Sequence, residues 1–217
     1  MRKVSINIMT YNRWELLNHT LKSIFRQEKS LRAKGIILEV IVINDGGTDV
    51  TDEKIKIYPK VKYSVLDAHG YNPNGTVLVA NDAVELSSGS IILMNAAECF
   101  HRSSNVIERL VKAVKPKHPA FATVINRPGD PNTMDDKEEK QKSGLNVVNT
   151  VQYSGISRQV PWFFCGAIMK KDFIELGGYS KTIIPADVEF GHRMIANGYT
   201  FEWLEDVIVI HQTHIRG

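Results

Sequence analysis

Two apolar runs rich in β-branched residues, with a helical stripe between them, constrain the fold of this chain more than any other feature. The runs are VSINIMT at residues 4–10 and ILEVIVIND at residues 37–45, and both have the composition of strands. The stripe between them has the spacing of one helix face and consists of Leu16, Leu17, Thr20, Leu21, Ile24 and Phe25. A strand, a helix and a second strand in this order form a β-α-β unit, whose two strands lie parallel in one sheet.

The same alternation continues as far as residue 126. The further predicted elements are strands at residues 61–67, 90–95 and 120–126 and helices at residues 75–87 and 106–114. Because strands and helices alternate, we predict the α/β class, with a Rossmann-like, mostly parallel sheet flanked by helices.

The pattern changes after residue 126. Residues 127–160 are rich in proline, glycine and charged residues and lack apolar periodicity, so we predict a flexible loop region there. The elements predicted beyond it are a short helix ending at Gly177 and Gly178, a helix over residues 187–197, and paired strands at residues 199–204 and 206–214. These strands form a small antiparallel C-terminal part of a single domain over residues 1–217.

Composition and charge set the class of protein but identify no partner. The 217 residues are 43% hydrophobic, enough for a core, and 27 Lys and Arg against 24 Asp and Glu give no indication of nucleic-acid binding. Cys99 and Cys165 are too few for a disulfide scaffold, which favours a reducing compartment. We find neither a signal peptide nor the roughly 20 apolar residues that cross a bilayer, so we predict a cytoplasmic protein without a transmembrane segment.

Polar clusters follow three of the predicted strands. In open α/β sheets, ligands bind beyond the carboxyl ends of the strands. The clusters are Thr10-Tyr11-Asn12-Arg13, Asn44-Asp45-Gly46-Gly47 and Asn95-Ala96-Ala97-Glu98. Three such clusters at one edge of a sheet favour a nucleotide-binding site.

Two of these clusters also have a purely structural interpretation. Asn12, with Glu15 three residues later, fits a helix cap of the capping-box kind. Asp45, Gly46 and Gly47 fit a turn in which glycine supplies a positive φ. Both alternatives remain open from the sequence.

Two long stretches resemble a known enzyme family. VSINIMTYNRWELLNHTLKSIFRQ followed by EVIVINDGGTD resembles the opening of family 2 glycosyltransferases with the GT-A fold. FFCGAIMKKDFIELGGYSKTIIPADVEFGHRMIANGY resembles the second signature of that family, in which a Gly-Gly turn leads to an acidic pair. The resemblance runs from Val4 to about His214. It implies transfer of a sugar from a nucleotide sugar, foremost a UDP-sugar, to a hydroxyl of a glycan or another acceptor.

The resemblance also implies a division of the chain and a set of donor-binding residues. Residues 1–126 would form the nucleotide-binding half, and residues 161–217 the acceptor and catalytic half. The residues expected to contact the donor are Thr10, Tyr11, Asn12, Arg13, Asp45, Gly46, Asn74, Gly75, Asn81, Asn95 and Ala96.

The metal motif of the family is altered in this chain. Most members hold a divalent metal with an Asp-x-Asp motif, whereas Asn95 to Glu98 is similar to an Asn-Pro-Glu-like variant with a histidine, here His101, soon after. Glu98 would then supply the one retained carboxylate to Mn²⁺ or Mg²⁺, which needs further ligands. His211 and His214 are the candidates, and because strand residues three apart face opposite sides, we expect only one to bind, preferably His214. His101 is a lesser candidate because we place it in the following helix.

The resemblance assigns the catalytic base to Asp187, the second residue of the acidic pair, although Ala186 replaces the first. Glu189 is the alternative base. A single base opposite the leaving group implies direct displacement with inversion. The structural alternative for Asp187, which follows Pro185, is a helix N-cap.

Two other functions remain possible from the sequence. The loss of two motif acids fits a sugar-nucleotide binding protein that no longer catalyses transfer. A nucleotidyltransferase would also use a parallel sheet and a metal, but it would be expected to have a glycine-rich loop after the first strand, and TYNRWELLNHT contains no glycine.

Overall fold

The computed structural model describes most of the chain. The described residues are 1–50, 52–66, 79–128, 146–147, 151–153, 156–158, 161, 163–183 and 185–213. The predicted site residues Asn74, Gly75 and His214 lie outside them, as does most of the region predicted to be a flexible loop.

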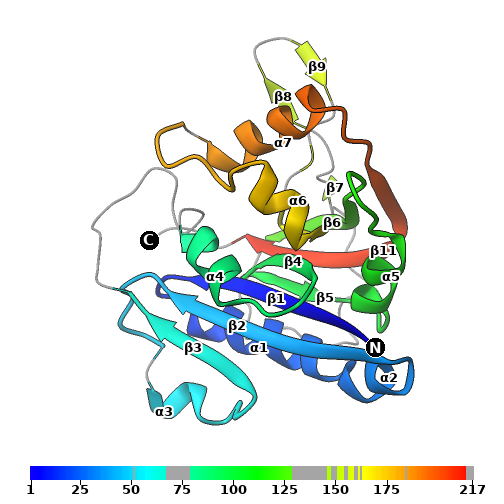
Figure 1. Ribbon diagram of the computed structural model, residues 1–217. Helices are drawn as coiled ribbons and strands as arrows, with labels where there is room; N and C mark the ends of the chain where they lie inside the picture. Colours follow the sequence, from blue (N-terminus) through cyan, green and yellow to red (C-terminus); the bar gives the residue numbers. More distant parts are fainter. Residues whose placement is uncertain are drawn as a thin grey trace.

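Within the described residues, nine strands form one sheet in the order β3-β2-β1-β4-β10-β6-β11-β5, with β7 paired to β6, and β8 and β9 form a separate pair (Figure 1). The strands are β1 (Arg2–Thr10), β2 (Ile36–Asn44), β3 (Val61–Val65), β4 (Ile91–Ala96), β5 (Cys99–His101), β6 (Ala120–Pro128), β7 (Asn146–Val147), β8 (Val151–Tyr153), β9 (Ile156–Arg158), β10 (Cys165–Met169) and β11 (Glu202–Thr213). The helices are α1 (Trp14–Phe25), α2 (Glu28–Ala33), α3 (Asp52–Ile55), α4 (Ala80–Leu86), α5 (Val106–Ala113), α6 (Lys170–Glu175) and α7 (Ala186–Ala196).

The first four strands of the sheet are parallel, and antiparallel pairing enters with the later strands. β1 pairs in parallel with β2 and β4, and β2 with β3, whereas β10 is antiparallel to both β4 and β6. β11 is parallel to β6 and antiparallel to β5. The predicted α/β class, with a mostly parallel sheet and an antiparallel part, is confirmed.

The two C-terminal strands predicted to pair with each other are in fact one strand. β11 runs from Glu202 to Thr213 along β6, with a register shift between Leu204 and Ile208. The acidic pair Glu205-Asp206, which resembles a turn in the sequence, lies at this irregularity and is exposed. Asp206 forms an ion pair with Arg109 of α5, at 2.6 Å between Oδ2 and Nη1.

The buried strands contribute alternate side chains to two apolar layers, one on each face of the sheet. Ile6, Val40 and Leu93 belong to the layer that α1 and α5 cover. Their neighbours Ile41 and Ile92 belong to the layer that α4, α6 and α7 cover. Because both faces are covered, the central strands read as nearly continuous apolar runs.

A buried carboxylate interrupts the apolar run of β2. Glu39 accepts hydrogen bonds from the hydroxyl of Ser5 and from the backbone N–H and hydroxyl of Ser88, at 2.8 and 2.6 Å. Lys62 Nζ lies 2.7 Å and Lys3 Nζ 3.3 Å from its Oε1. Burial opposes ionisation, but the bonds from Lys62, Ser5 and Ser88 outweigh it and hold the pKa of Glu39 well below its ordinary 4.5.

Glu39→Gln is therefore expected to lower the free energy of unfolding at pH 7 by about 1–3 kcal/mol, because it leaves buried donors without their anion. A carboxylate with a lowered pKa stabilises the fold above its unfolded pKa of 4.5, and this contribution declines as the pH falls below that value. Urea unfolding should thus show a constant difference from wild type between pH 7 and 5.5 and a smaller one at pH 4. Glu175→Gln, at an exposed site, is the control; an unchanged difference at pH 4 would contradict the assignment.

Candidate active site

The ends of β1 and β2 are held together by the two turns that follow them. Asn12 Oδ1 accepts hydrogen bonds from the backbone N–H groups of Thr48 and Asp49, at 2.7 and 3.3 Å. Asp45 N donates to Thr10 O at 2.9 Å. The polar clusters predicted at these two strand ends therefore form one surface.

The capping-box interpretation of Asn12 and Glu15 is wrong. The N-cap of α1 is Arg13, and no local side chain caps the helix. The first helical N–H, that of Trp14, instead donates to Asp49 Oδ2 at 2.6 Å, across 35 residues of sequence. Because Asn12 turns toward residues 48 and 49 with a φ of 47°, its side chain joins the two turns.

Glycines make the second turn fit against the first. Gly46 has a φ of 76°, which confirms the predicted turn with positive φ. A Cβ on Gly47 would lie 2.7 Å from the backbone nitrogen of Asn12, too close for any other residue without displacement of the turn. Beside this junction, half of the Tyr11 side chain is exposed, and Asp45 is half-buried.

Glu98 lies in the turn between β4 and β5 and makes two contacts through one oxygen. Arg13 Nη1 lies 2.7 Å from Glu98 Oε1, and His211 Nε2 lies 3.6 Å from the same atom. Burial raises the pKa of this carboxyl, but His211 and Arg13 outweigh burial and lower the pKa to about 2. Glu98 is therefore an ionised carboxylate between two nitrogen groups.

His211, the less favoured of the two predicted histidines, is the one that the structure places beside Glu98. β11 pairs with β5, which follows Glu98 directly, so that His211 lies opposite Cys99. Gln212 N also donates to Glu98 O at 3.0 Å. His214 lies outside the described residues.

The prediction that His101 lies in a helix is wrong. His101 ends the short strand β5 and is fully buried, because its ring belongs to the interior behind the Glu98 turn. Asn95, a predicted donor contact, is also fully buried, and its side chain bonds to Cys99 O and to His101 Nε2. Ala96 ends β4 at the surface of the turn and remains a candidate.

Glu98 and His211 fit a divalent metal only as a two-ligand site. Among the described residues, no three His, Cys, Asp or Glu side chains gather closely enough to hold a metal ion. One carboxylate oxygen and one imidazole nitrogen suit Mn²⁺ or Mg²⁺ if phosphate oxygens and water supply the remaining ligands. Arg13 contacts the same oxygen, so a metal bound there would compete with the guanidinium for it.

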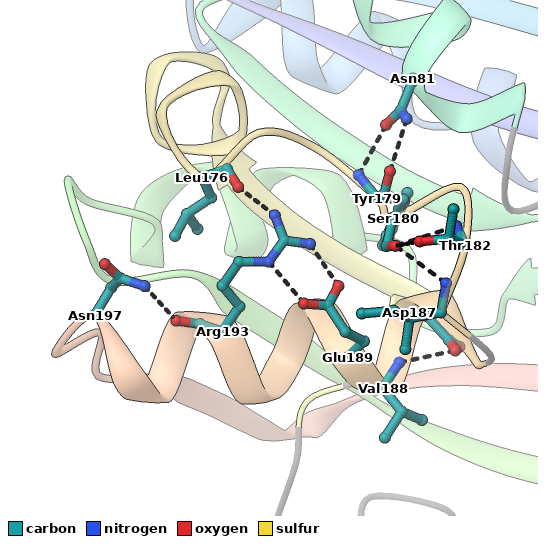
Figure 2. A network of polar contacts seen from close by, with 11 residues as sticks. Asn81, Leu176, Tyr179, Ser180, Thr182, Asp187, Val188, Glu189, Arg193 and Asn197 are labelled. Atoms are coloured by element: carbon teal, nitrogen blue, oxygen red, sulfur yellow. Dashed lines mark hydrogen bonds and ion pairs between the residues drawn. The ribbon is translucent and has the colours of Figure 1, made fainter.

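Asp187 lies at the second position of α7 (Figure 2). The N-cap of this helix is Pro185, so the N-cap interpretation of Asp187 is wrong. Asp187 Oδ1 accepts the N–H of Val188 at 2.9 Å, and burial raises the pKa of its carboxyl. The charge of Asp187 contributes, after burial, to the raised pKa of Tyr179.

The side chains of Glu189 and Asn81 both form hydrogen bonds within the protein (Figure 2). Glu189 receives two bonds from Arg193, from Nε at 2.9 Å and from Nη2 at 2.5 Å, while Arg193 Nη1 donates to the carbonyl of Leu176. Asn81 Nδ2 donates to Tyr179 O at 3.0 Å, and Asn81 Oδ1 accepts the Tyr179 N–H at 2.9 Å. These contacts fix α7 and the segment before it against α6 and α4.

A groove of about 410 Å³ lies along the outer face of α7 and does not coincide with this site. It begins beside Pro185 and includes Glu189, but neither Asp187 nor Glu98 lines it. Of the two predicted base candidates, only Glu189 therefore faces the groove.

A comparison with known proteins identifies the family. The model of the family described as Glycosyl transferase family 2 matches residues 5–177. This chain belongs to glycosyl transferase family 2. The match includes the turns after β1 and β2 and Glu98, whereas Asp187 and His211 lie beyond it.

Individual relatives of this family 2 chain share part of its sequence or its fold. It is 31% identical over 113 residues to the uncharacterized glycosyltransferase YwdF of Bacillus subtilis (strain 168), a match that covers 52% of this chain and 38% of YwdF. A solved mannosyltransferase, PcManGT from Pyrobaculum calidifontis in complex with GDP-Man and Mn²⁺, has a TM-score of 0.70 at 19% identity. S. aureus TarS 1–349 in complex with UDP-GlcNAc has a TM-score of 0.70 at 14% identity.

These similarities establish the GT-A fold over the family 2 chain. The structural matches cover 100% and 99% of this chain but only 58% of PcManGT and 60% of the TarS structure. No helix among the described residues combines the length and the apolar character needed to cross a membrane.

Proposed function

We propose that this chain transfers a sugar from a nucleotide-sugar donor to an acceptor hydroxyl, with inversion at the anomeric carbon. The observation that carries the proposal is the ionised Glu98 between Arg13 and His211, next to the joined turns of β1 and β2, in a family 2 chain. Family membership also favours glycosyl transfer over nucleotidyl transfer.

The donor surface consists of the turns after β1 and β2, with a UDP-sugar as the proposed donor. Tyr11 exposes half of its surface, which suits stacking on a nucleobase, and Asp45 can accept hydrogen bonds from base or ribose. Thr10 Oγ1 is buried without a hydrogen-bond partner among the described residues, and a polar ligand would satisfy it. The fold neighbours that bind UDP-GlcNAc and GDP-Man support a nucleotide sugar in general. Asn74 and Gly75 remain proposed diphosphate contacts.

Glu98 and His211 are the proposed ligands of Mn²⁺ or Mg²⁺, with His214 as a further candidate. When bound, such an ion neutralises the charge that grows on the leaving diphosphate. Arg13, which lies on Glu98 in this structure, becomes available for the diphosphate when it leaves that carboxylate. Its guanidinium geometry suits phosphate oxygens.

Asp187 is the proposed base. A carboxylate accepts a proton from a hydroxyl more effectively when its pKa is raised, and burial raises the pKa of Asp187. The proton moves from the acceptor hydroxyl to a carboxylate oxygen of Asp187 while the hydroxyl oxygen attacks the anomeric carbon. The bond from that carbon to the diphosphate oxygen breaks at the same time, and the nucleoside diphosphate leaves with the bonding electron pair. Glu189 is a poor substitute because Arg193 holds both of its oxygens.

The direct test is ligand-induced stabilisation by UDP-sugars and GDP-sugars with Mn²⁺ or Mg²⁺. A ligand at about 100 times its dissociation constant adds about 2.7 kcal/mol to the free energy of unfolding, which thermal unfolding detects readily. No stabilisation by any nucleotide sugar or nucleoside diphosphate would contradict the proposal.

Asp45→Ala is expected to weaken nucleotide binding without loss of the fold, because a half-buried residue in a strand-end turn tolerates truncation. Isothermal titration with UDP should show a loss of about tenfold, the order of one charge-assisted hydrogen bond. Asp82→Ala, in α4, is the control at a second carboxylate. Unchanged UDP affinity in Asp45→Ala would remove this residue from the donor surface.

One rival function is supported by a specific contact. The ion pair between Arg13 and Glu98 already neutralises the one retained motif carboxylate, as expected of a sugar-nucleotide binding protein without catalysis. Hydrolysis of the nucleotide sugar, measured with and without Mn²⁺, distinguishes the transferase from the binding protein, because the binding protein would bind the nucleotide sugar without hydrolysing it.

A further inference from the structure

The backbone carbonyls of residues 96 to 99, which form the turn around Glu98, each accept a hydrogen bond from the protein. Asn95 Nδ2 donates to Ala96 O at 2.9 Å and to Cys99 O at 2.8 Å, on either side of Glu98. Thr20 Oγ1 donates to the carbonyl of residue 97 at 2.7 Å, and Gln212 N donates to Glu98 O at 3.0 Å. The Asn95 amide is the one side chain among these donors that spans the turn.

His101 in turn fixes the Asn95 amide. Because both protons of Asn95 Nδ2 are used, Oδ1 must accept, and His101 Nε2 lies 2.9 Å from it. His101 Nε2 therefore carries a proton. The other ring nitrogen, Nδ1, lies 2.8 Å from Gln27 Nε2.

The contacts of Gln27 with the other ring nitrogen, Nδ1, indicate the same tautomer of His101, with the proton on Nε2. Its Oε1 accepts the N–H of Ile107 at 3.2 Å, and its Nε2 donates to Ser23 O at 3.0 Å. The second proton of Nε2 points to His101 Nδ1, which must accept. A second ring proton would place two donors face to face, so the ring is neutral, and burial followed by the charge of Arg26 lowers its pKa to about 3.

The three side chains are too deeply buried to touch a substrate. His101 and Asn95 are fully buried, and Gln27 is 2% exposed. A buried polar chain is unfavourable unless every group is paired, and apolar side chains would fill the same space more simply. The hydrogen bonds from Gln27 through His101 to Asn95 hold the turn, and hence the Glu98 carboxylate, in a single orientation.

We propose that His101 is a positioning residue that, through Asn95, holds Glu98 where it can bind the metal of a metal–nucleotide complex. This inference rests on the proposed role of Glu98 and assigns to His101 no contact with metal or substrate.

Two polar substitutions of His101 distinguish its hydrogen bond to Asn95 from its hydrogen bond to Gln27. His101→Gln keeps an amide N–H near the position of Nε2 and so retains the donor to Asn95. His101→Asn keeps an amide oxygen near the position of Nδ1, which retains the acceptor for Gln27 but leaves Asn95 Oδ1 without its donor. Both variants lose one buried hydrogen bond, so urea unfolding should show similar losses of stability.

The binding of Mn²⁺ in the presence of UDP, followed by the electron paramagnetic resonance of free Mn²⁺, should distinguish the two. We expect His101→Asn to weaken Mn²⁺ binding by about 10-fold or more, the usual effect of removing an outer-shell partner, and His101→Gln to stay within about twofold of wild type. Glu39→Gln, which is destabilised outside the site, should bind Mn²⁺ as wild type does. Equal affinities in the two His101 variants would overturn the proposal.

Two further measurements complete the test. If Glu98→Gln loses Mn²⁺ binding while His101→Asn keeps it, the positioning role fails and the proposed function stands; if Glu98→Gln keeps it, both fail. Nitrogen-15 spectra of the wild-type imidazole need no variant to fold: a neutral ring protonated at Nε2 is expected, and the other tautomer or a charged ring at pH 7 would overturn the proposal.

Discussion

Asp187→Asn is expected to abolish sugar transfer while the protein still binds its donor. The amide retains the volume of the side chain and an oxygen for the Val188 N–H, but it cannot take the proton of the acceptor hydroxyl. Loss of a general base lowers turnover by about 10²–10⁴-fold, whereas the dissociation constant for UDP should change little, because the base acts on the acceptor. Turnover and UDP titration on the same preparation measure both quantities.

Stability provides an independent check on the same variant. A carboxyl whose pKa is raised by burial favours the protonated folded state, so its contribution to stability is lost as the pH rises through the folded pKa. Asp187→Asn should therefore be at least as stable as wild type at pH 7. A residue kept at some loss of stability is more readily explained by catalysis than by packing.

Glu189→Gln is the matched control, two positions along α7. It breaks the paired bonds from Arg193 and should lower the melting temperature, yet leave turnover within a few-fold of wild type. A larger loss of turnover in Glu189→Gln than in Asp187→Asn would show that the base has been assigned to the wrong carboxylate.

The parts of the fold predicted from sequence are those that local patterns determine. β1, β2 and β4 are buried on both faces, so their apolar runs stand out, and the polar residues after them mark the strand ends. The helix predicted at residues 187–197 occurs as α7, Ala186–Ala196. The sequence predicts two strands where β11 is one, because an exposed acidic pair at the register shift has the composition of a turn.

The contacts within the site that the sequence does not reveal are made by partners that are distant in sequence. Asp49 bonds the first N–H of α1, so no local motif around Asn12 reveals the arrangement. Asn81, which the sequence predicts to contact the sugar-nucleotide donor, pairs its amide with the backbone of Tyr179. A Cβ on Gly178 would lie 2.6 Å from Asn81 Oδ1, so the glycine is required for this pairing, which no spacing rule predicts.

The arrangement at Glu98 also depends on tertiary contacts. The sequence indicates one carboxylate and two candidate histidines, but the position of His211 beside Glu98 follows from the pairing of β11 with β5. The ion pair with Arg13 joins residues 85 positions apart and has no signature in the sequence. The same contact determines how substitutions at the two residues should differ.

Glu98→Gln and Arg13→Gln are expected to change Mn²⁺ binding in opposite directions. Removal of the carboxylate eliminates the anionic ligand, so Mn²⁺ affinity measured without nucleotide should fall by about 100-fold. Loss of a ligand should weaken binding at least as much as loss of a residue that only positions a ligand, which costs about 10–100-fold. Removal of the guanidinium frees Glu98 Oε1 and eliminates a like charge, so Arg13→Gln should bind Mn²⁺ more tightly than wild type. Arg109→Gln, which removes an exposed cation of α5, is the control for net charge.

These opposite effects distinguish a metal ligand from a simple ion-pair partner. If Glu98 served only to hold Arg13, Glu98→Gln would lower stability and leave the Mn²⁺ dependence of turnover as in wild type. Arg13→Gln would then fail to tighten Mn²⁺ binding, because no metal would share that oxygen. A wild-type Mn²⁺ dependence in both variants would mean that Glu98 is not a metal ligand. A loss of turnover in Arg13→Gln would then show that Arg13, with its charge directed to the diphosphate, neutralises the leaving group, and that Glu98 serves as an anchor for its guanidinium.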